Sequence, residues 1–469
     1  MKSNTCSVMS MVVVGVVVCS LAQAVEISLT ASDGGGATSF NTGLHWNGGQ
    51  APSAGNTYTT GSFDLRTPTS TGNLTFGGDS LRVDSGGRFV VKAASSIFTF
   101  NNGGLILNGG GVVSASLGAI STVEGTVDVM ANSFFQIGVN NEILNVDSII
   151  SGSANLTVNS VAAGSVGTVV FKGANTHTGA TIVDPYGNLR LANQNALQYS
   201  TLTMSGNASS SLKFDSSVAA NAFTFGGLAA TNSGTGYNIG LTNNAGTPAA
   251  VALTVGGNNS NTTYAAVLSG SGSLIKTGSG TLTLAGTNTY TGATTVSNGT
   301  LSITGTLSNS PITVVNGGTL AGTGLVVNVV ANAGHMAPGV GTGVGGIGTL
   351  TFASNVTWNG ESAAGSSWIW DADPNSAAVD RLFINGNFSK GTGSAFCFDF
   401  RGGSLQKGTT YTLVEWTGTS GFAAGDFSAT NVILPGTLGS RANFLIESGV
   451  TNRLKMQVVS PTGTLLSVW

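Results

Sequence analysis

A short motif that occurs twice constrains this chain more than any other feature of its sequence. Residues 173–183 read GANTHTGATIV and residues 286–296 read GTNTYTGATTV, with the same residue at eight of the eleven positions. Each copy lies between short runs in which apolar and hydroxyl residues alternate. A unit of strand, turn and strand that recurs along a chain predicts an architecture built by stacking, because neighbouring units then bury one continuous core.

The second copy shows the strand pattern most clearly. Directly before its turn, Thr281 and Thr283 alternate with Leu282 and Leu284. Successive side chains of a strand point to opposite faces, so this segment has one apolar face and one hydroxylated face. Similar short apolar runs, separated by Gly or Asn, begin at Leu74 and favour a β-helix over a sandwich of long strands. The sequence therefore predicts an all-β fold, a parallel β-solenoid.

The composition agrees with strands joined by tight turns. Charged residues make up 7% of the chain, against about 25% in an ordinary globular protein, while 71 residues are glycine. The apolar share of 41% is too high for a disordered tail. The formal net charge of −3 and the scarcity of Lys and Arg provide no basic surface for nucleic acid, so this class of partner is excluded.

The first 24 residues have the pattern of a cleavable export signal. Lys2 precedes a nearly continuous apolar run over residues 8–21, and the small residues Ala22 and Ala24 frame a cleavage site after Ala24. Cleavage there would leave Cys397 as the only cysteine, so we expect no intramolecular disulfide, no transmembrane segment in the mature chain, and a secreted or outer-surface location. Because Cys397 lies in an apolar strand-like run, we expect it to be buried and inert.

The spacing of short apolar runs and turn residues along the sequence divides the mature chain into four parts. Residues 25–73 are irregular and are expected to form an N-terminal cap, because the first coil of a solenoid would otherwise expose unpaired backbone groups. Residues 74–330 are the predicted solenoid, with the clearest repeat at 268–305 and a weaker copy at 150–191. Residues 331–350 are predicted to form a Gly-rich corner. The tryptophan-rich residues 351–469 are predicted to form a C-terminal β-rich capping module.

The polar residues of the shared turn have two possible interpretations. Asn adopts left-handed backbone geometry easily and Gly fits where backbones crowd, so a structural role at the coil corners explains most of the motif. We assign that role to the residues at matching positions of the two copies: Asn175, Gly179, Asn288, Tyr290 and Gly292. The alternative is that Asn175, Asn288, Tyr290 and His177 line a binding strip.

Residues 274–296 closely resemble the autotransporter-associated β-strand repeat, which is found in the passenger regions of exported bacterial surface proteins. This resemblance implies a right-handed parallel β-helix and a cell-surface location. Residues 334–350, which contain Pro338, are similar to the segment that closes many such passengers. The chain after Leu350 is too short and irregular for a large translocating barrel. The resemblance therefore implies passenger-like structure without an evident C-terminal translocator barrel.

Catalytic and metal-binding patterns are weak. Asp371, Asp373 and Asp380 form the only local group of acids, with Arg381 adjacent, and are the one candidate for a carbohydrate or Ca²⁺ site. The simpler interpretation is that these are solvated acids of turns. The three histidines are far apart in sequence and have no neighbouring cysteine, so neither a metal site nor a cofactor is predicted.

Three functions remain open from the sequence. The first is a non-catalytic structural or adhesin-like surface solenoid, whose partners would be polysaccharide or further copies of the chain. The second is a carbohydrate-active β-helix enzyme, either a polysaccharide lyase or a glycoside hydrolase, which requires the three acids and Arg381 to converge in a groove. The third is an autotransporter passenger whose translocator is separate or lost.

Overall fold

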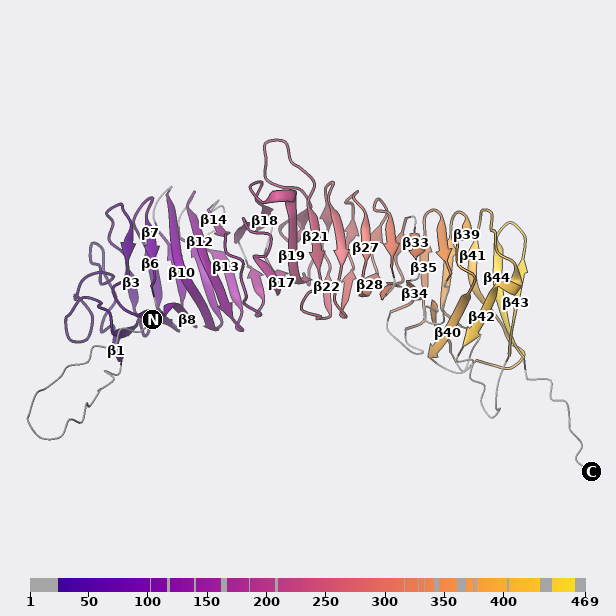
Figure 1. Ribbon diagram of the computed structural model, residues 1–469, viewed down its shortest axis with the longest axis horizontal. Coiled ribbons are helices and arrows are strands. Elements are labelled where there is room, and N and C mark those ends of the chain that lie inside the picture. The colour runs from indigo at the N-terminus through magenta and orange to yellow at the C-terminus, as the bar shows by residue number, and fades with distance from the viewer. Residues whose placement is uncertain are drawn as a thin grey trace, which may run out of the picture.

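The computed structural model describes residues 24–459, except residues 102, 116–118, 139–140, 162–166, 185, 207–209, 316, 328, 333, 341–345, 361–367, 374–375, 377, 403–404 and 431–440. The predicted export signal therefore lies outside the described residues, apart from Ala24. The described chain is an elongated stack of short strands that runs from the N-terminal to the C-terminal end of the molecule (Figure 1). No helix in this part of the chain is long and apolar enough to cross a membrane.

The longest sheet runs along almost the whole stack and contains fifteen parallel strands. In spatial order its strands are β3 (Asp64–Arg66), β6 (Arg88–Val91), β9 (Gly111–Ser114), β11 (Ser133–Ile137), β13 (Leu156–Ser160), β15 (Thr181–Val183), β17 (Leu197–Met204), β19 (Ala222–Ala229), β21 (Ala252–Val255), β24 (Ser273–Lys276), β27 (Thr294–Val296), β30 (Ile312–Val314), β33 (Val329–Asn332), β36 (Val356–Asn359) and β39 (Phe388–Lys390).

A second parallel sheet covers the N-terminal half of the stack. Its strands are β1 (Val25–Ser28), β2 (Asn56–Thr59), β5 (Ser80–Asp84), β8 (Gly104–Asn108), β10 (Ile120–Ala131), β12 (Ile143–Gly152), β14 (Thr168–Phe171), β16 (Asn188–Leu191) and β18 (Ser211–Phe214), with β4 (Leu74–Thr75) and β7 (Ile97–Thr99) beside them.

Smaller sheets continue the other sides of the coil toward the C-terminus. Two of the three larger ones are wholly parallel: β22 (Thr262–Tyr264), β25 (Thr281–Leu284), β28 (Gly299–Ile303), β31 (Gly318–Gly322) and β34 (His335–Pro338); and β37 (Trp368–Asp371), β40 (Phe396–Gly402) and β42 (Phe427–Thr430). A third contains β26 (Thr287–Asn288), β29 (Thr306–Leu307), β32 (Leu325–Val326), β35 (Thr349–Phe352), β38 (Arg381–Ile384), β41 (Thr410–Trp416), β44 (Asn452–Val459) and β43 (Arg441–Glu447). The short pair is β20 (Ile239–Gly240) with β23 (Leu268–Ser269), and single 3-10 turns span Ala219–Asn221, Thr235–Tyr237 and Ala424–Asp426.

These sheets confirm the predicted all-β solenoid. The alternation expected before the second shared turn is observed, since Leu282 and Leu284 are buried and Thr281 and Thr283 are half-buried on the other face. The same residue type stacks on successive coils: Leu282 pairs with Leu301, and Leu301 pairs with Leu320. Such columns of aliphatic side chains form the core, whose members are almost wholly removed from solvent.

The length of a coil changes along the stack. Hydrogen-bonded partners on neighbouring coils lie 24 residues apart at Asp84 and Asn108, 20 apart at Asn259 and Ser279, and 32 apart at Asn355 and Asn387. The repeat motif is visible in the sequence only in the middle of the chain, although the N-terminal coils also keep a regular spacing of 24 to 25 residues.

Aromatic side chains fill both ends of the core. Near the N-terminus, Phe40 and Trp46 lie in the segment between β1 and β2; Phe40 packs against Phe76 at a ring distance of 5.5 Å, and Trp46 against Tyr58 at 4.9 Å. At the other end the rings of Trp358 and Trp368 stack 3.6 Å apart. The last two strands, β44 and β43, pair antiparallel, in contrast to the parallel stack before them.

The divisions proposed from the sequence stay predictions, because the same sheets run through them. β1 to β3 lie within residues 25–73 and already pair in parallel with later coils. β33 and β34 lie within residues 331–350 or reach into them, and both belong to the stack. Cys397 is only half-buried in β40, so the expectation that it is buried is wrong: Phe396 and Phe398 on either side take the core positions.

Truncating Phe40 is expected to loosen the first coils. Phe40→Ala removes a wholly buried ring and should cost about 3–5 kcal/mol of local stability. Because each coil of a solenoid interacts mainly with the coils next to it, hydrogen exchange should accelerate in β1 to β9 and stay unchanged in β43 and β44. Leu44→Ala is the matched control, since Leu44 lies in the same segment but is exposed. Uniformly faster exchange along the chain would contradict this prediction.

Candidate functional site

The two corner asparagines of the repeat bind neighbouring coils together. The Asn175 side chain accepts a hydrogen bond from the backbone N–H of Ile150 (2.9 Å) and donates to the carbonyl of Ala196 (3.0 Å). Asn288 accepts from the N–H of Leu268 (2.9 Å) and donates to the carbonyls of its own coil and of the next, at Gly286 (3.0 Å) and Thr306 (3.4 Å). Both side chains are almost completely buried. Each amide therefore satisfies backbone groups that the coil corner leaves unpaired.

The glycines of the shared turn lie where successive coils come closest. A Cβ atom on Gly179 would collide with the carbonyl of Ala154, and one on Gly292 with the carbonyl of Gly272. Because these obstacles are backbone atoms of the preceding coil, the collision cannot be relieved by a side-chain rotation. Only glycine fits at these two positions without moving a coil.

A buried chain of hydroxyl groups accompanies each copy of the motif. In the second copy, the Tyr290 hydroxyl contacts the Thr294 hydroxyl (2.5 Å), Thr294 contacts Ser310 (2.7 Å), and Ser310 donates to the carbonyl of Gly292 (2.7 Å). Ser310 lies one coil further on and was not identified from the sequence. The shared threonine of the motif is the signal that could have pointed to this network.

The first copy repeats this network with a histidine in place of the tyrosine. His177 Nε2 lies 2.7 Å from the Thr181 hydroxyl, Thr181 lies 2.9 Å from Ser200, and Ser200 donates to the carbonyl of Gly179 (2.6 Å). His177 Nδ1 is buried without a hydrogen-bond partner among the described residues. Burial lowers the pKa of His177 to about 4 and raises that of Tyr290 to about 12, so both side chains are neutral at pH 7.

The predicted binding strip does not reach the surface. The side chains of Asn175, His177, Asn288 and Tyr290 are each at most 1% exposed, and their hydrogen bonds are made within the chain. A ligand outside the solenoid has no access to them. The geometry therefore supports the structural interpretation of the motif.

The candidate acidic group is partly assembled. Asp380 Oδ1 accepts from the N–H of Gly348 (2.9 Å) and Oδ2 from the N–H of Asp371 (2.8 Å). Asp371 and Asp380 are both 2% exposed, while Asp373 is half-buried and accepts a hydrogen bond from Ser376 (2.6 Å). Burial raises the pKa of Asp380 to about 7, although the two N–H donors oppose this shift.

Arg381 does not complete this group. Its side chain, on the first residue of β38, is exposed, whereas Asp380 is buried; it lies 3.8 Å from the carboxylate of Glu415, which also pairs with Arg453 at 2.8 Å. Among the described residues, no three His, Cys, Asp or Glu side chains gather in a way that could hold a metal ion. The arrangement fixes the corner between β37 and β38 and provides no open pair of carboxylates for acid–base chemistry.

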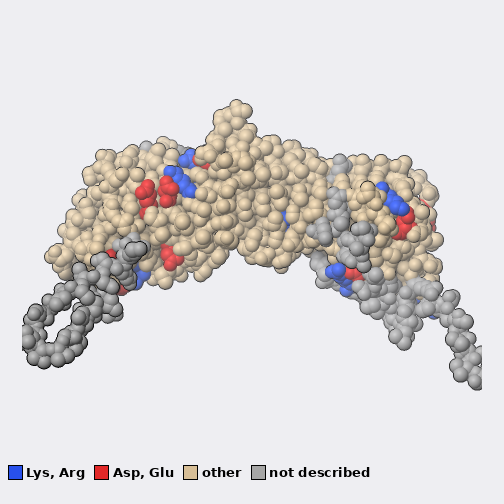
Figure 2. Space-filling view, in the orientation of Figure 1, with Lys and Arg blue, Asp and Glu red and all other residues tan. Residues whose placement is uncertain are grey.

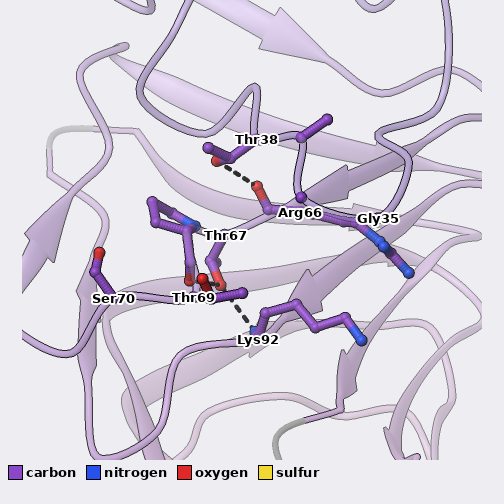
Figure 3. Close-up of a pocket in the computed structure, with 10 residues that line it drawn as sticks. Gly35, Thr38, Arg66, Thr67, Thr69, Ser70 and Lys92 are labelled. Carbon is purple, nitrogen blue, oxygen red and sulfur yellow. Dashed lines mark hydrogen bonds between the residues drawn. The ribbon is translucent and has the colours of Figure 1, made fainter.

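An open cavity of about 330 Å³ lies at the N-terminal end of the solenoid (Figure 3). Its wall is formed by residues 35–38, residues 66–70 and Lys92, which come from the segment after β1, the end of β3 and the residue after β6. The Thr38 hydroxyl donates to the carbonyl of Arg66 (2.9 Å), and the N–H of Lys92 donates to the hydroxyl of Thr67 (2.8 Å). The sequence did not predict this cavity, because its three lining segments are separate in the chain and come together only in the folded coils.

Asp33 holds the capping segment beside this cavity. It accepts hydrogen bonds from the N–H and hydroxyl of Ser39 (2.8 and 2.7 Å), from the N–H of Arg66 (2.8 Å) and from His45 Nδ1 (2.9 Å). This carboxylate is buried, and its hydrogen-bonding capacity is used within the cap. The position of residues 34–38 on β3 is therefore fixed by the chain itself.

Comparison with protein families finds a match on the repeated motif. The model of the passenger-associated transport repeat matches residues 163–184 and 274–303. These two segments contain both copies of the shared turn and β25, β27 and β28 of the stack. No curated protein matches the chain by sequence.

Replacing Asn288 is expected to weaken the contact between coils. Asn288→Leu keeps the branched shape of the side chain but leaves the N–H of Leu268 buried without its partner, which should cost about 1–3 kcal/mol in urea denaturation. Asn309→Leu is the matched control, because Asn309 is exposed in the next coil. Equal stability of the two variants would contradict the structural role of Asn288.

His177 is expected to make stability depend on pH. An unfolded histidine binds a proton near pH 6.5, while His177 in the folded chain does so only near pH 4. The contribution of the neutral ring is thus fully present above pH 6.5 and is lost as the pH falls from 6.5 to about 4, by up to about 3 kcal/mol.

The second repeat supplies the variant that tests this pH dependence. His177→Tyr places there the side chain found at position 290, so the variant should lose less stability than the parent between pH 7 and pH 5 in urea denaturation. The difference between parent and variant isolates His177 from the other histidines. Tyr290→His should introduce a similar loss in the second repeat. Parallel pH profiles of parent and His177→Tyr would show that the ring is not buried as described.

Proposed function

We propose that this passenger-like β-solenoid, with its two passenger-associated transport repeats, is an exported surface protein that acts through its outer faces and not by catalysis. In this proposal the stack of coils is a stiff spacer, and its sides make weak, repeated contacts with neutral polysaccharide or with other copies of the chain. The fold and the repeat match support the passenger-like part of the proposal. The contacts rest on the distribution of charge.

The central coils carry almost no charge. From Ser216 to Trp370 the sequence contains only two residues among Lys, Arg, Asp and Glu, namely Lys276 and Glu361. Lys276 is 1% exposed, and its ammonium group donates to the carbonyls of Thr277 (2.6 Å), Gly278 (2.9 Å) and Asn298 (3.2 Å). The charged side chains on the face shown in Figure 2 gather toward the two ends of the molecule.

A charge-free surface of hydroxyl groups suits uncharged partners. Outward positions on successive strands carry threonine in register, as at Thr295 on β27 and Thr313 on β30. Their hydroxyl groups can exchange hydrogen bonds with sugar hydroxyls, and their methyl groups offer apolar contact. Two copies of such a surface also meet without electrostatic repulsion. This stretch is the observation that carries the adhesive part of the proposal.

We do not propose polysaccharide cleavage at Asp371, Asp373 and Asp380. A glycosidase needs two accessible carboxyl groups on opposite sides of the scissile bond. Here Asp380 is enclosed by two backbone N–H groups, and Arg381 contacts Glu415.

The adhesive proposal is tested by placing charge on the neutral face. The parent should retain neutral glucans in affinity electrophoresis, or self-associate in sedimentation, with little dependence on salt because no charges take part. Thr295→Lys combined with Thr313→Lys should weaken either interaction about tenfold or more. Thr157→Lys is the control, since Thr157 is a similarly half-buried outward residue on β13. Absence of both interactions in the parent would leave only the spacer role.

A further inference from the structure

The cavity at the N-terminal end combines a hollow surface with two basic side chains on its wall that have no described carboxylate partner. Nine of the Lys and Arg side chains in the described part of the chain form ion pairs with Asp or Glu: Arg82, Arg88, Lys172, Arg190, Arg381, Lys390, Arg401, Arg453 and Lys455. Arg66 and Lys92 pair with no described carboxylate, and both line the cavity.

Arg66 is held in place and still has donors to offer. One terminal nitrogen of its guanidinium group, Nη1, donates to the carbonyl of Gly34 (3.1 Å), which fixes the group against the capping segment. Its Nε atom has no hydrogen-bond partner among the described residues but is shielded from solvent, so the donors left for a ligand are those of the terminal nitrogens. A guanidinium group that is positioned but incompletely bonded is suited to receive two oxygens of one anionic group.

Lys92 adds a second positive charge on the same side. Its backbone is fixed by the hydrogen bond from its N–H to the Thr67 hydroxyl, while its side chain makes no hydrogen bond or ion pair within the described chain. Figure 3 shows the Arg66 and Lys92 side chains extending in the same direction, with their nitrogen ends on one side of the cavity. A single anion between these ends would meet both charges.

The acidic groups nearby are already engaged. Asp64 precedes Arg66 on β3 by two residues and forms a two-point ion pair with Arg88 (2.6 and 2.8 Å). Asp33 is buried and accepts four hydrogen bonds from the cap. Neither carboxylate is placed to neutralise Arg66 and Lys92 across the cavity. The local charge at the cavity is therefore positive, which favours a negatively charged ligand.

We propose that this cavity binds a small anionic sugar, with its acidic group between Arg66 and Lys92. The hydroxyl groups of Thr38, Thr69 and Ser70 line the same space and can bond to sugar hydroxyls, and Pro68 offers an apolar surface for the ring. The volume of about 330 Å³ lies at the small end of the range for ligand sites. The shared chemistry is one carboxylate or phosphate on a hydroxylated carrier.

Ligand-observed nuclear magnetic resonance on the whole chain tests the proposal with three probes. Glucuronate carries a carboxylate, glucose 6-phosphate carries a phosphate, and glucose carries neither. We expect at least one of the two anionic probes to bind and glucose not to bind. Arg66→Gln and Lys92→Gln should each weaken binding about tenfold to a hundredfold, since a charge-assisted hydrogen bond contributes about 1.5–3 kcal/mol. The difference in affinity between glucuronate and glucose 6-phosphate shows whether the site prefers a carboxylate or a phosphate.

The controls separate a lost site from a lost fold. Lys213→Gln removes an exposed lysine of β18 that also pairs with no described carboxylate, and it should leave binding unchanged. Hydrogen exchange of β3 and β6 should be the same in all three variants, because Arg66 holds Asp33 through its backbone. Failure of both anionic probes to bind, equal binding of glucose, or indifference to both Arg66 and Lys92 would overturn the proposal. None of these outcomes bears on the neutral central coils, so the proposed function stands or falls separately.

Discussion

The in-register pairing of each coil with the next is the interaction on which the rest of the structure depends. A parallel strand pair satisfies the backbone only if every coil returns to the same lateral position, and each return places a residue over its counterpart. The columns of leucine at positions 282, 301 and 320 show the result in the core. At the corners, where strands end, Asn175 and Asn288 supply the hydrogen bonds that the strand pairing cannot. The stack is thus one continuous hydrogen-bonded object in which no single coil is stable alone.

The sequence predicts the parts of this structure that are local and repeated. Alternation of Thr and Leu over residues 281–284 is set by the strand itself, so the buried face could be read directly. The two copies of the shared turn place the same residue types at the coil corners: backbone crowding requires Gly179 and Gly292, while Asn175 and Asn288 bond to backbone groups of neighbouring coils. After the second copy the coils lengthen from about 20 to 32 residues. Before the first copy they keep a spacing of about 24 residues, but no motif recurs in the sequence at that spacing.

The parts that could not be predicted depend on contacts between coils. Sequence adjacency suggested that Asp380 and Arg381 act together, but Asp380 is buried, whereas Arg381 is exposed and meets Glu415 on the next coil. Conversely, nothing in the sequence relates Arg66 to Lys92. They share a cavity because β3 and β6 pair in register and because residues 34–38 fold over the end of the stack. Such a site requires knowledge of the coil length. The N-terminal coils keep a spacing of 24 to 25 residues, but no motif repeats in their sequence from which that length could be read.

The two repeats also show what the fold requires of its polar interior. Position 177 holds histidine and position 290 holds tyrosine, yet both reach a threonine hydroxyl four residues on, and each threonine passes the contact to a serine of the next coil. Both positions require a polar atom at the same place on an uncharged side chain. They do not require a particular residue type. A charge at position 177 or 290 would have no described partner of opposite sign to offset its desolvation. The outer faces of the central coils also carry almost no charge. Charged side chains can therefore act mainly at the ends of the solenoid, where the cap and the cavity lie.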